Sequence, residues 1–498
     1  MRPDTSSVAP IASDESALLA RAFTRAAGAP LVPGNAVRLL QDAAENYPAW
    51  LAAIRSAQHR VYFENYFIAD DECGAGFAAA LSERARAGVK VRLIHDWMGS
   101  YAKASRRFWR SMSEAGVEVR SFNPPRLSRP FNWLHRDHRK MLAVDGRIGF
   151  VTGLCVGQMW AGNPARGLDP WRDTGIEVQG PALHDVEQAF ANVWQTMGPP
   201  IAADECGPRE TFATAGDVAV RIVANAPGTT GLFRLDQLIA AAARRTLWLT
   251  DAYFAGIPPY VQALRAAALD GVDVRLLVPG ASDIPLLRPL SQAGYRPLLE
   301  AGVRVFEWKG SMLHAKTAVA DGAWARVGSS NLNVASWIGN YELDAVIENE
   351  AFAAEMERTY LTDLEYATEI VLQPRRRRID EPKRGGSAKP RLQGMGVGIG
   401  AASGSASRAT AGALRIGRTV GAALSEQRVM APNEARVIGI VGVLLLGVVV
   451  AALLWPLVVA IPVAFVCGWL SLALLLRAYA LRRERRARSL PRTRVEPK

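Results

Sequence analysis

Cysteine and histidine are scarce in this 498-residue chain, which contains four cysteines and six histidines. The cysteines stand far apart, as Cys73, Cys155, Cys206 and Cys467, and none of them belongs to a CxxC pair. Their spacing therefore favours neither a zinc site nor a disulfide framework, and it suits a reducing compartment. No acidic cluster suggests a metal either, so we expect a protein that needs no metal and no other cofactor.

Acidic residues become rare towards the C-terminus, and this explains most of the net charge of +12. Residues 374–436 contain thirteen Lys or Arg against four Asp or Glu, and residues 477–498 contain nine against two. Residues 1–373 consequently have a net charge of −4. A nucleic-acid-binding body would show a basic face of its own, so we expect no nucleic-acid partner. A basic tail suits a surface of anionic lipid instead.

Residues 437–476 lack charge altogether and are mostly apolar. One membrane span needs about 20 residues, so this run suits two spans joined near Trp455-Pro456. Arg436 and Arg477 flank the run, and the positive-inside tendency places both flanks in the cytoplasm. We therefore predict a C-terminal transmembrane hairpin at 437–476. A buried pair of soluble helices and a single long tilted span are the alternatives.

The remaining ends of the chain have less pattern. Residues 1–35 lack the basic start and long apolar run of a signal peptide, so we interpret them as a loose or partly helical leader. Residues 374–436 are rich in Gly, Ser and Ala beside their basic residues and predict a basic linker. An amphipathic helix at 409–425 is an open alternative within that linker. Residues 477–498 are interpreted as a basic cytoplasmic tail.

The body of the chain contains an internal duplication. Three strand-like segments at 61–67, 88–94 and 117–119 return in the same order at 247–254, 271–277 and 303–305. The repeat period is about 185 residues, which indicates duplicated domains and not a short-repeat solenoid. Strands alternate with helical stretches, so each copy is predicted to be an α/β domain. We place the first domain at 36–200 and the second at 210–373, with a linker between them.

Each copy contains the same group of reactive residues at the same spacing. The first has His138, Lys140 and Asp145 in HRKMLAVDG, and the second has His314, Lys316 and Asp321 in HAKTAVADG. Alternation along a strand places each histidine and its lysine on one face. A single His-x-Lys tripeptide often occurs by chance, but two copies at matching positions of two repeated units are not expected by chance.

Two such histidines can perform a covalent two-step reaction on a phosphodiester. A neutral imidazole attacks phosphorus without adding negative charge, and an imidazole has a pKa near 6.5. A second, protonated imidazole gives a proton to the departing alkoxide. Two lysines offset the negative charge that develops on the phosphoryl oxygens. The pattern thus predicts a phosphohistidine intermediate on the histidine of one domain, with the histidine of the other domain as the proton donor.

These motifs resemble the phospholipase D superfamily, whose pattern is HxKxxxxD followed by GSxN. The second copy matches fully, because Gly328-Ser329-Ser330-Asn331 follows Asp321. The first copy departs, since Thr152-Gly153-Leu154-Cys155 puts Gly153 at the Ser position and Cys155 at the Asn position. We expect weaker phosphate binding in the first half and retained activity. The resemblance implies two phospholipase D-like α/β domains packed with pseudo-symmetry.

The strings YFENYFIADD, GVKVRLIHDWMGS and VGSSNLNVASWIGNYELD are similar to bacterial cardiolipin synthases over residues 36–370, although the C-terminal hairpin departs from that family. The resemblance makes His138 the nucleophile and His314 the general acid. It also implies a carboxylate after each motif that supports the motif's histidine, with Asp173 and Glu342 as the candidates. The implied phosphate-binding residues are Lys140, Lys316, Ser329 and Asn331. We expect Asp145 and Asp321 to complete the motifs by holding local structure. Glu64 and Asp251 end equivalent strands and either face the site or cap a strand.

The resemblance therefore predicts a membrane-bound phosphatidyltransferase that uses phosphatidylglycerol and a second lipid alcohol. A phospholipase D that uses water is an alternative, because only the acceptor differs. A nuclease of the same superfamily and a non-catalytic membrane scaffold are the others. The expected location is the bacterial inner membrane, with the catalytic part in the cytoplasm. The oligomeric state and the acyl preference stay open.

Overall fold

The computed structural model describes residues 12–125, 135–202, 205–281, 283, 287–371 and 446–447. The chain divides into two compact units, Met1–Arg384 and Gly385–Lys498. The expected linker at 374–436 and tail at 477–498 lie outside the described residues, as does the expected hairpin apart from Leu446 and Gly447. Within the described part of the chain, no helix has the length and apolar character needed to cross a membrane.

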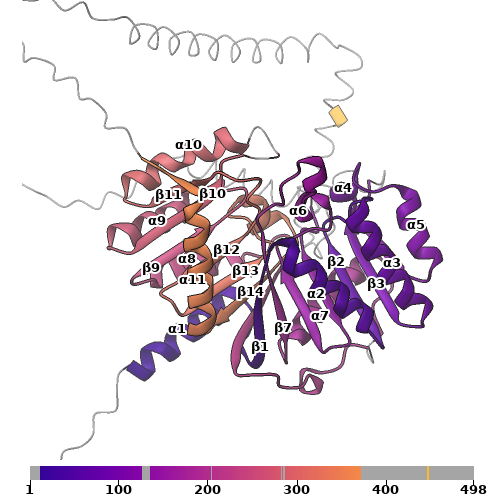
Figure 1. Cartoon of the computed structure of the whole chain (residues 1–498). Coiled ribbons are helices and arrows are strands. Elements are labelled where there is room, and N and C mark those ends of the chain that lie inside the picture. Colours follow the sequence, from indigo (N-terminus) through magenta and orange to yellow (C-terminus); the bar gives the residue numbers. More distant parts are fainter. Residues whose placement is uncertain are drawn as a thin grey trace, which may run out of the picture. The chain divides into compact units, whose positions relative to one another are not determined.

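The first half of the Met1–Arg384 unit is an α/β domain built on seven strands (Figure 1). The strand order is β1-β7-β6-β5-β2-β3-β4. Strands β2, β3 and β4 run parallel, and the other neighbours are antiparallel. Its strands are β1 (Val32–Gln41), β2 (Arg60–Asn65), β3 (Lys90–Asp96), β4 (Glu118–Phe122), β5 (Lys140–Val144), β6 (Ile148–Thr152) and β7 (Thr174–Gln179). Its helices are α2 (Asp42–Ser56), α3 (Glu72–Arg86), α4 (Trp97–Ser100), α5 (Arg106–Glu114), α6 (Gln158–Ala161) and α7 (Leu183–Trp194).

The second half repeats this order, with β8-β14-β13-β12-β9-β10-β11 and an additional edge strand, β15. Its strands are β8 (Val218–Asn225), β9 (Thr246–Thr250), β10 (Asp273–Pro279), β11 (Arg304–Trp308), β12 (Thr317–Ala320), β13 (Trp324–Gly328), β14 (Glu342–Glu348) and β15 (Ala367–Ile370). Its helices are α8 (Gly231–Ala242), α9 (Pro258–Leu269), α10 (Leu287–Glu300) and α11 (Glu350–Glu365). The predicted duplication into two α/β domains is therefore confirmed.

The N-terminal segment is more structured than the sequence indicated. Helix α1 (Ala12–Ala27) buries Phe23 and Ala27 against the outer core of the second half. Strand β1 begins at Val32, so the boundary expected at residue 36 falls inside a strand. Strand β1 also pairs with β8 in antiparallel register, which joins the two halves into one continuous sheet. The expectation of a partly helical segment therefore holds for α1, whereas the domain boundary at residue 36 was wrong because β1 already begins at Val32.

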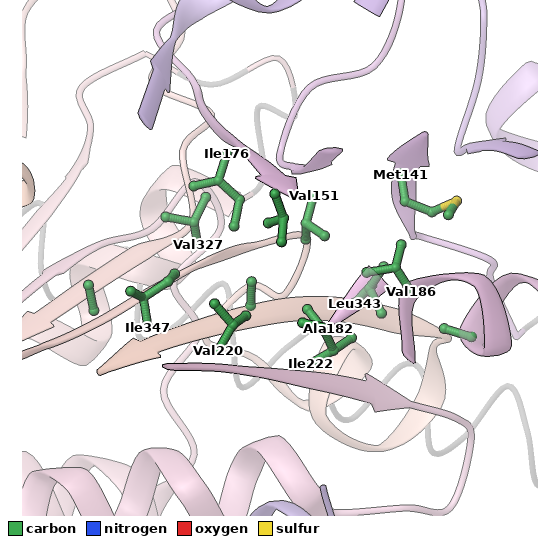
Figure 2. Close-up of a cluster of buried hydrophobic side chains, with 14 of the residues drawn as sticks. Met141, Val151, Ile176, Ala182, Val186, Val220, Ile222, Val327, Leu343 and Ile347 are labelled. Carbon is green, nitrogen blue, oxygen red and sulfur yellow. The ribbon is translucent and has the colours of Figure 1, made fainter. Parts of the chain in front are cut away.

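The two halves share one hydrophobic core. Figure 2 shows Met141, Val151 and Ile176 of the first half beside side chains of the second. The facing residues of the second half include Val220, Val327, Leu343 and Ile347. Burying one such side chain stabilises a fold by about 1.5–3 kcal/mol, so a core of this extent holds the halves as one body. Elements from distant parts of the sequence can therefore build one site with fixed geometry.

Tight turns orient the strands that follow the two histidines. Asp145 and Gly146 connect β5 to β6 with φ angles of 55° and 65°. Asp321 and Gly322 connect β12 to β13 with φ angles of 53° and 69°. Positive φ at both central residues belongs to a type I′ turn, which matches the twist of a hairpin and favours Asp-Gly. The two hairpins of the duplicated motif are thus built in the same way.

Candidate active site

The two histidines lie just before equivalent strands, and each is bound to the opposite half through its backbone. The N–H of His138 donates to the carbonyl of Tyr341 at 2.9 Å, and the N–H of His314 donates to the carbonyl of Arg172 at 2.7 Å. Isolated parallel bridges join Asp137 to Tyr341 and Arg172 to Leu313. The segment that precedes each histidine is therefore held against the segment that follows the other half's motif.

Each imidazole also makes a side-chain bond across the same junction. Nδ1 of His138 lies 2.9 Å from Oε2 of Glu342, and Nδ1 of His314 lies 2.7 Å from Oδ2 of Asp173. The expectation that each carboxylate supports the histidine of its own motif was wrong, because the pairing is crossed. The backbone bonds at Tyr341 and Arg172 account for this, since they bring the next residue of each chain segment to the opposite histidine.

The bond to Glu342 determines which nitrogen of His138 can react. A carboxylate accepts a proton-bearing nitrogen, so Nδ1 carries the hydrogen and the lone pair remains on Nε2. Burial lowers the pKa of His138, and the nearby Lys140 lowers it further against the opposing effect of Glu342. His138 is consequently neutral at neutral pH, which is the state that a nucleophile needs.

Two groups compete for Nδ1 of His314. Asp173 Oδ2 lies at 2.7 Å and Lys316 Nζ lies at 2.9 Å. We assign the Nδ1 hydrogen to the bond with Asp173, because that contact is shorter and reproduces the geometry of His138 with Glu342. Burial and the charge of Lys316 together lower the pKa of His314 to about 3. His314 is therefore also neutral when no anion occupies the site.

The lysines of both motifs are buried beside the histidines. Lys140 Nζ donates to the carbonyl of His138 at 2.6 Å, and Lys316 Nζ donates to the carbonyl of His314. Burial lowers the pKa of Lys316 to about 8. The charge of Lys316 also lowers the pKa of His138, and that of Lys140 lowers the pKa of His314. Each lysine thus acts on both histidines, so the two motifs form one site.

The GSxN segment of the second half meets this site at two points. Ser329 Oγ donates to Oε2 of Glu342 at 2.5 Å, so this hydroxyl already holds the carboxylate that orients His138. Oδ1 of Asn331 is buried and has no hydrogen-bond partner. An unpaired buried amide oxygen is costly, and it suits a site that receives a hydrogen-bond donor from a ligand.

The first half replaces these groups with a different arrangement around Asp173. A Cβ atom on Gly153 would lie 2.2 Å from Oδ1 of Asp173, so no side chain fits where the second half has Ser329. The indole Nε1 of Trp160 donates to Oδ2 of Asp173 at 2.8 Å instead. Cys155, at the position that matches Asn331, is buried, and its burial raises the pKa of the thiol.

The aspartates of the two motifs lie away from the histidines, at the far ends of strands β5 and β12. Oxygens of Asp145 accept the backbone N–H groups of Gln58, His59 and Arg60 at 2.7–2.9 Å. Oxygens of Asp321 accept those of Arg244, Arg245 and Thr246 at 2.7–2.9 Å. These contacts fasten the start of the neighbouring strand, as expected of residues that hold local structure.

The two carboxylates that end strands β2 and β9 differ from each other. Asp251 accepts the N–H of Leu332 at 2.8 Å and the N–H of Tyr253 at 3.1 Å, which is a capping role. Glu64 is fully buried, and burial next to Asp137 raises its pKa well above its ordinary value. Asp137 precedes His138 in the chain, so Glu64 lies beside the segment that leads into His138.

Four aromatic residues at the site had not been predicted from the motifs. Tyr66 has its ring 5.1 Å from that of His138, with Lys140 Nζ 5.2 Å from the tyrosine ring centre. Tyr253 has its ring 5.7 Å from that of His314, with Lys316 Nζ at 5.7 Å. Trp160 and Trp171 are the others, with their rings 5.2 Å and 5.7 Å from that of His314. Nothing in their local sequence distinguishes them from core aromatics, and only the fold brings them to the histidines.

The described residues contain no group of three or more His, Cys, Asp or Glu side chains arranged to hold a metal ion. Two pseudo-symmetric α/β halves that share one pair of His-x-Lys motifs define the class of phospholipase D-like proteins. The family described as cardiolipin synthase, PLD-like domain, matches residues 50–194 and 235–364. The chain belongs to this family.

Curated relatives of known name support this assignment. A cardiolipin synthase of Alkalihalophilus pseudofirmus is 31% identical over 347 residues, which cover 68% of this chain and 68% of that protein. Cardiolipin synthase 1 of Bacillus anthracis is 31% identical over 372 residues, or 72% of each chain. Cardiolipin synthase A of Pseudomonas fluorescens is 33% identical over 363 residues, covering 70% of this chain and 73% of the relative.

A solved structure gives the same fold. The crystal structure of a phosphatidylserine synthase from Haemophilus influenzae superposes with a TM-score of 0.55, at 15% sequence identity. The superposition covers 71% of this chain and 92% of the other. The similarity at this identity concerns the fold alone.

Proposed function

We propose that this protein is a phosphatidyltransferase of the cardiolipin synthase type. It transfers a phosphatidyl group from phosphatidylglycerol, through a phosphohistidine, to a second phospholipid alcohol. The single observation that supports this most is the crossed pairing of His138 with Glu342 and of His314 with Asp173. That pairing leaves the Nε2 atom of each imidazole available at one site between two buried lysines.

The first step forms the covalent intermediate. Nε2 of His138 attacks phosphorus, the bond from phosphorus to the glycerol oxygen breaks, and His314 gives a proton to that oxygen. His314 needs a proton for this role, although its pKa is about 3 in the free site. A bound phosphodiester brings a negative charge that offsets the lysines, so substrate binding raises the pKa of His314 towards the working range. Substrate binding therefore favours the protonated form of His314, which can then act as the acid.

The second step reverses the roles. The hydroxyl group of a second phosphatidylglycerol attacks phosphorus, the bond from phosphorus to Nε2 breaks, and neutral His314 takes the hydroxyl proton. The products are cardiolipin and free His138. Lys140, Lys316 and the Nδ2 amino group of Asn331 hold the nonbridging oxygens in both steps, and the charge of the two lysines offsets the charge that develops there. Water in place of the lipid alcohol would instead give phosphatidic acid.

Both substrates reside in a bilayer, so we propose that the protein works at the bacterial inner membrane. The uncharged run at 437–476 and the basic segments on either side of it support this location. They also support a cytoplasmic catalytic unit, because basic flanks favour that side.

Product analysis with the purified full chain tests the proposal. We expect cardiolipin and glycerol from phosphatidylglycerol in mixed micelles, and none from the His138→Ala variant. Acid quenching after incubation with phosphorus-labelled substrate should trap label on the wild type and not on that variant. Phosphatidic acid as the only lipid product would reassign the protein as a hydrolase. Absence of both products and of trapped label would leave a non-catalytic protein.

A further inference from the structure

A basic and aromatic surface lies next to the active site, on the first half. It comprises residues 97–110, which include α4, the following loop and the first part of α5. The segment contains Lys103, Arg106, Arg107 and Arg110 and no acidic residue. Residues 1–373 as a whole have a net charge of −4, so this concentration of positive charge is local.

The cations of this surface face solvent. Lys103, Arg106, Arg107 and Arg110 are all exposed, whereas Phe108 and Met112 anchor the inner side of α5 in the core. Within the described residues, none of the four cations takes part in an ion pair. Unpaired arginines on a helix that is anchored by apolar residues are free to meet an external anion.

Aromatic side chains surround a hollow beside these arginines. The cavity has a volume of about 530 Å³, and its lining includes Trp97, Tyr101, Trp109, Arg106 and Arg110. Tyr101 is 66% exposed, so this aromatic residue is largely in contact with solvent. Surfaces that combine Trp and Tyr with Arg are typical of proteins that bind at the headgroup level of a membrane.

This surface is continuous with the active site. Gly99 lies against Tyr66 so closely that a Cβ atom there would be 2.5 Å from the Tyr66 carbonyl oxygen. The Tyr66 ring in turn contacts His138. Strand β3, which leads into α4, is paired with β2, and β2 is paired with the strand that carries Lys140. Figure 1 shows α4 and α5 at the β3 side of the first half.

We propose that residues 97–110 form a docking surface for the anionic phospholipid face of a bilayer. The arginines bind the acidic headgroups, and Trp97 and Tyr101 enter the interfacial layer. Docking at this surface brings Tyr66, and with it the ring of His138 that Tyr66 contacts, close to the lipid headgroups. The inference rests on the proposed function for its choice of partner, since a lipid substrate requires such contact.

Hydrogen exchange of the full chain in phospholipid discs tests the docking surface separately from catalysis. The His138→Ala variant is used, so that turnover does not alter the lipid. We expect the amides of 97–110 to exchange several-fold more slowly in discs that contain phosphatidylglycerol than in discs of phosphatidylcholine alone. A failed cardiolipin assay would overturn the proposed function without affecting this measurement.

Two matched triple variants in the same background identify the charges responsible. Arg106→Gln, Arg107→Gln and Arg110→Gln together should abolish the difference between the discs. Arg55, Arg86 and Arg147 are also exposed, at the opposite ends of the strands of the same half, and they provide the control. Their replacement by Gln removes the same charge and should leave the difference intact.

Three results would overturn the docking surface. Equal exchange in the two kinds of disc would exclude recognition of anionic lipid, whether both are fast or both are slow. A retained difference in the Arg106, Arg107 and Arg110 variant would assign it to other residues. Protection in detergent alone that increases with protein concentration would show that a second copy of the chain covers this face.

Discussion

The carboxylate of Glu342 lies 2.9 Å from Nδ1 of His138, although 204 residues separate the two in the chain. The same carboxylate also accepts hydrogen bonds from the hydroxyl of Ser329 at 2.5 Å and from Nδ2 of Asn340 at 3.1 Å. The His138 ring thus owes its orientation and tautomer to residues of the opposite half. The mirror arrangement joins His314 to Asp173. Neither half can form a competent histidine without the other.

Replacing Glu342 should therefore affect the nucleophile more than the fold. The Glu342→Gln variant keeps a polar side chain of the same size, but it no longer enforces the Nδ1–H tautomer. We expect kcat to fall by about 10²–10⁴-fold, the scale on which positioned acid–base groups act. The check is acid quenching, in which the labelled intermediate should form slowly. The Ser329→Ala variant is a milder companion, and normal label formation in Glu342→Gln would contradict this role.

The indole of Trp160 should support His314 through Asp173. Trp160→Phe keeps an aromatic ring beside His314 but removes the hydrogen bond from Nε1 to Asp173. We expect about a tenfold loss of kcat, which corresponds to one hydrogen bond of about 1.4 kcal/mol. Trp171→Phe is the control, because its ring also lies near His314 without a bond to Asp173. An equal loss in both variants would attribute the effect to packing.

The pH dependence should show an acid limb below the ordinary histidine value and an alkaline limb near 8. Burial lowers the pKa of His138, so the nucleophile stays neutral down to a pH below 6.5. The ammonium of Lys316 is present below its pKa of about 8 and is lost as pH rises through it. A plot of kcat/KM against pH for the free enzyme should therefore decline on both sides.

The Lys316→Arg variant separates these limbs. A guanidinium stays charged throughout the working range, so the decline near pH 8 that comes from the Lys316 ammonium should disappear even if the maximal rate falls. The acid limb should remain. An alkaline limb that stays near pH 8 in this variant would assign it to another group.

The motif aspartates should matter for stability and not for chemistry. Asp145→Ala removes the acceptor of three backbone N–H groups, and it puts alanine at a φ of 55°. We expect a loss of about 1–3 kcal/mol in the free energy of unfolding, seen as a lower melting temperature. Asn tolerates positive φ, so Asp145→Asn should lose less. Activity per folded molecule should persist, and a wild-type melting temperature with abolished labelling would instead make Asp145 catalytic.

The buried pair of Glu64 and Asp137 should make stability fall as pH rises. Burial raises the pKa of Glu64 well above its ordinary value of 4.5 and raises that of Asp137 to about 7. The folded state then binds protons that the unfolded chain releases, so unfolding becomes easier between about pH 4.5 and 7. Glu64→Gln can donate to Asp137 without titrating. We expect a smaller drop in melting temperature from pH 5 to pH 8 in this variant, and an unchanged drop would contradict the assignment.

The duplicated motifs, the two α/β domains and the identity of both histidines could all be predicted from the sequence. Those features rest on local spacing, such as His-x-Lys on one strand and Asp-Gly in a type I′ turn. The crossed hydrogen bonds of Asp173 and Glu342 could not be predicted, because nothing in the local sequence of either motif indicates which carboxylate will lie beside which histidine. Trp160 and Tyr66 were missed for the same reason. The pattern around each of them equally suits a buried core.

The amino-acid sequence by itself determined the chemistry of this protein, since the residue types and their spacing specify a covalent transfer at phosphorus. Only the tertiary structure decided how each histidine is oriented, because the pairing of β1 with β8 and the shared core bring each motif to the other half's carboxylate. The physical reason is the difference in sequence range between local patterns and tertiary hydrogen bonds. Periodicity and turn propensity act over a few residues, whereas the bonds that give an imidazole its tautomer join residues 141 and 204 positions apart.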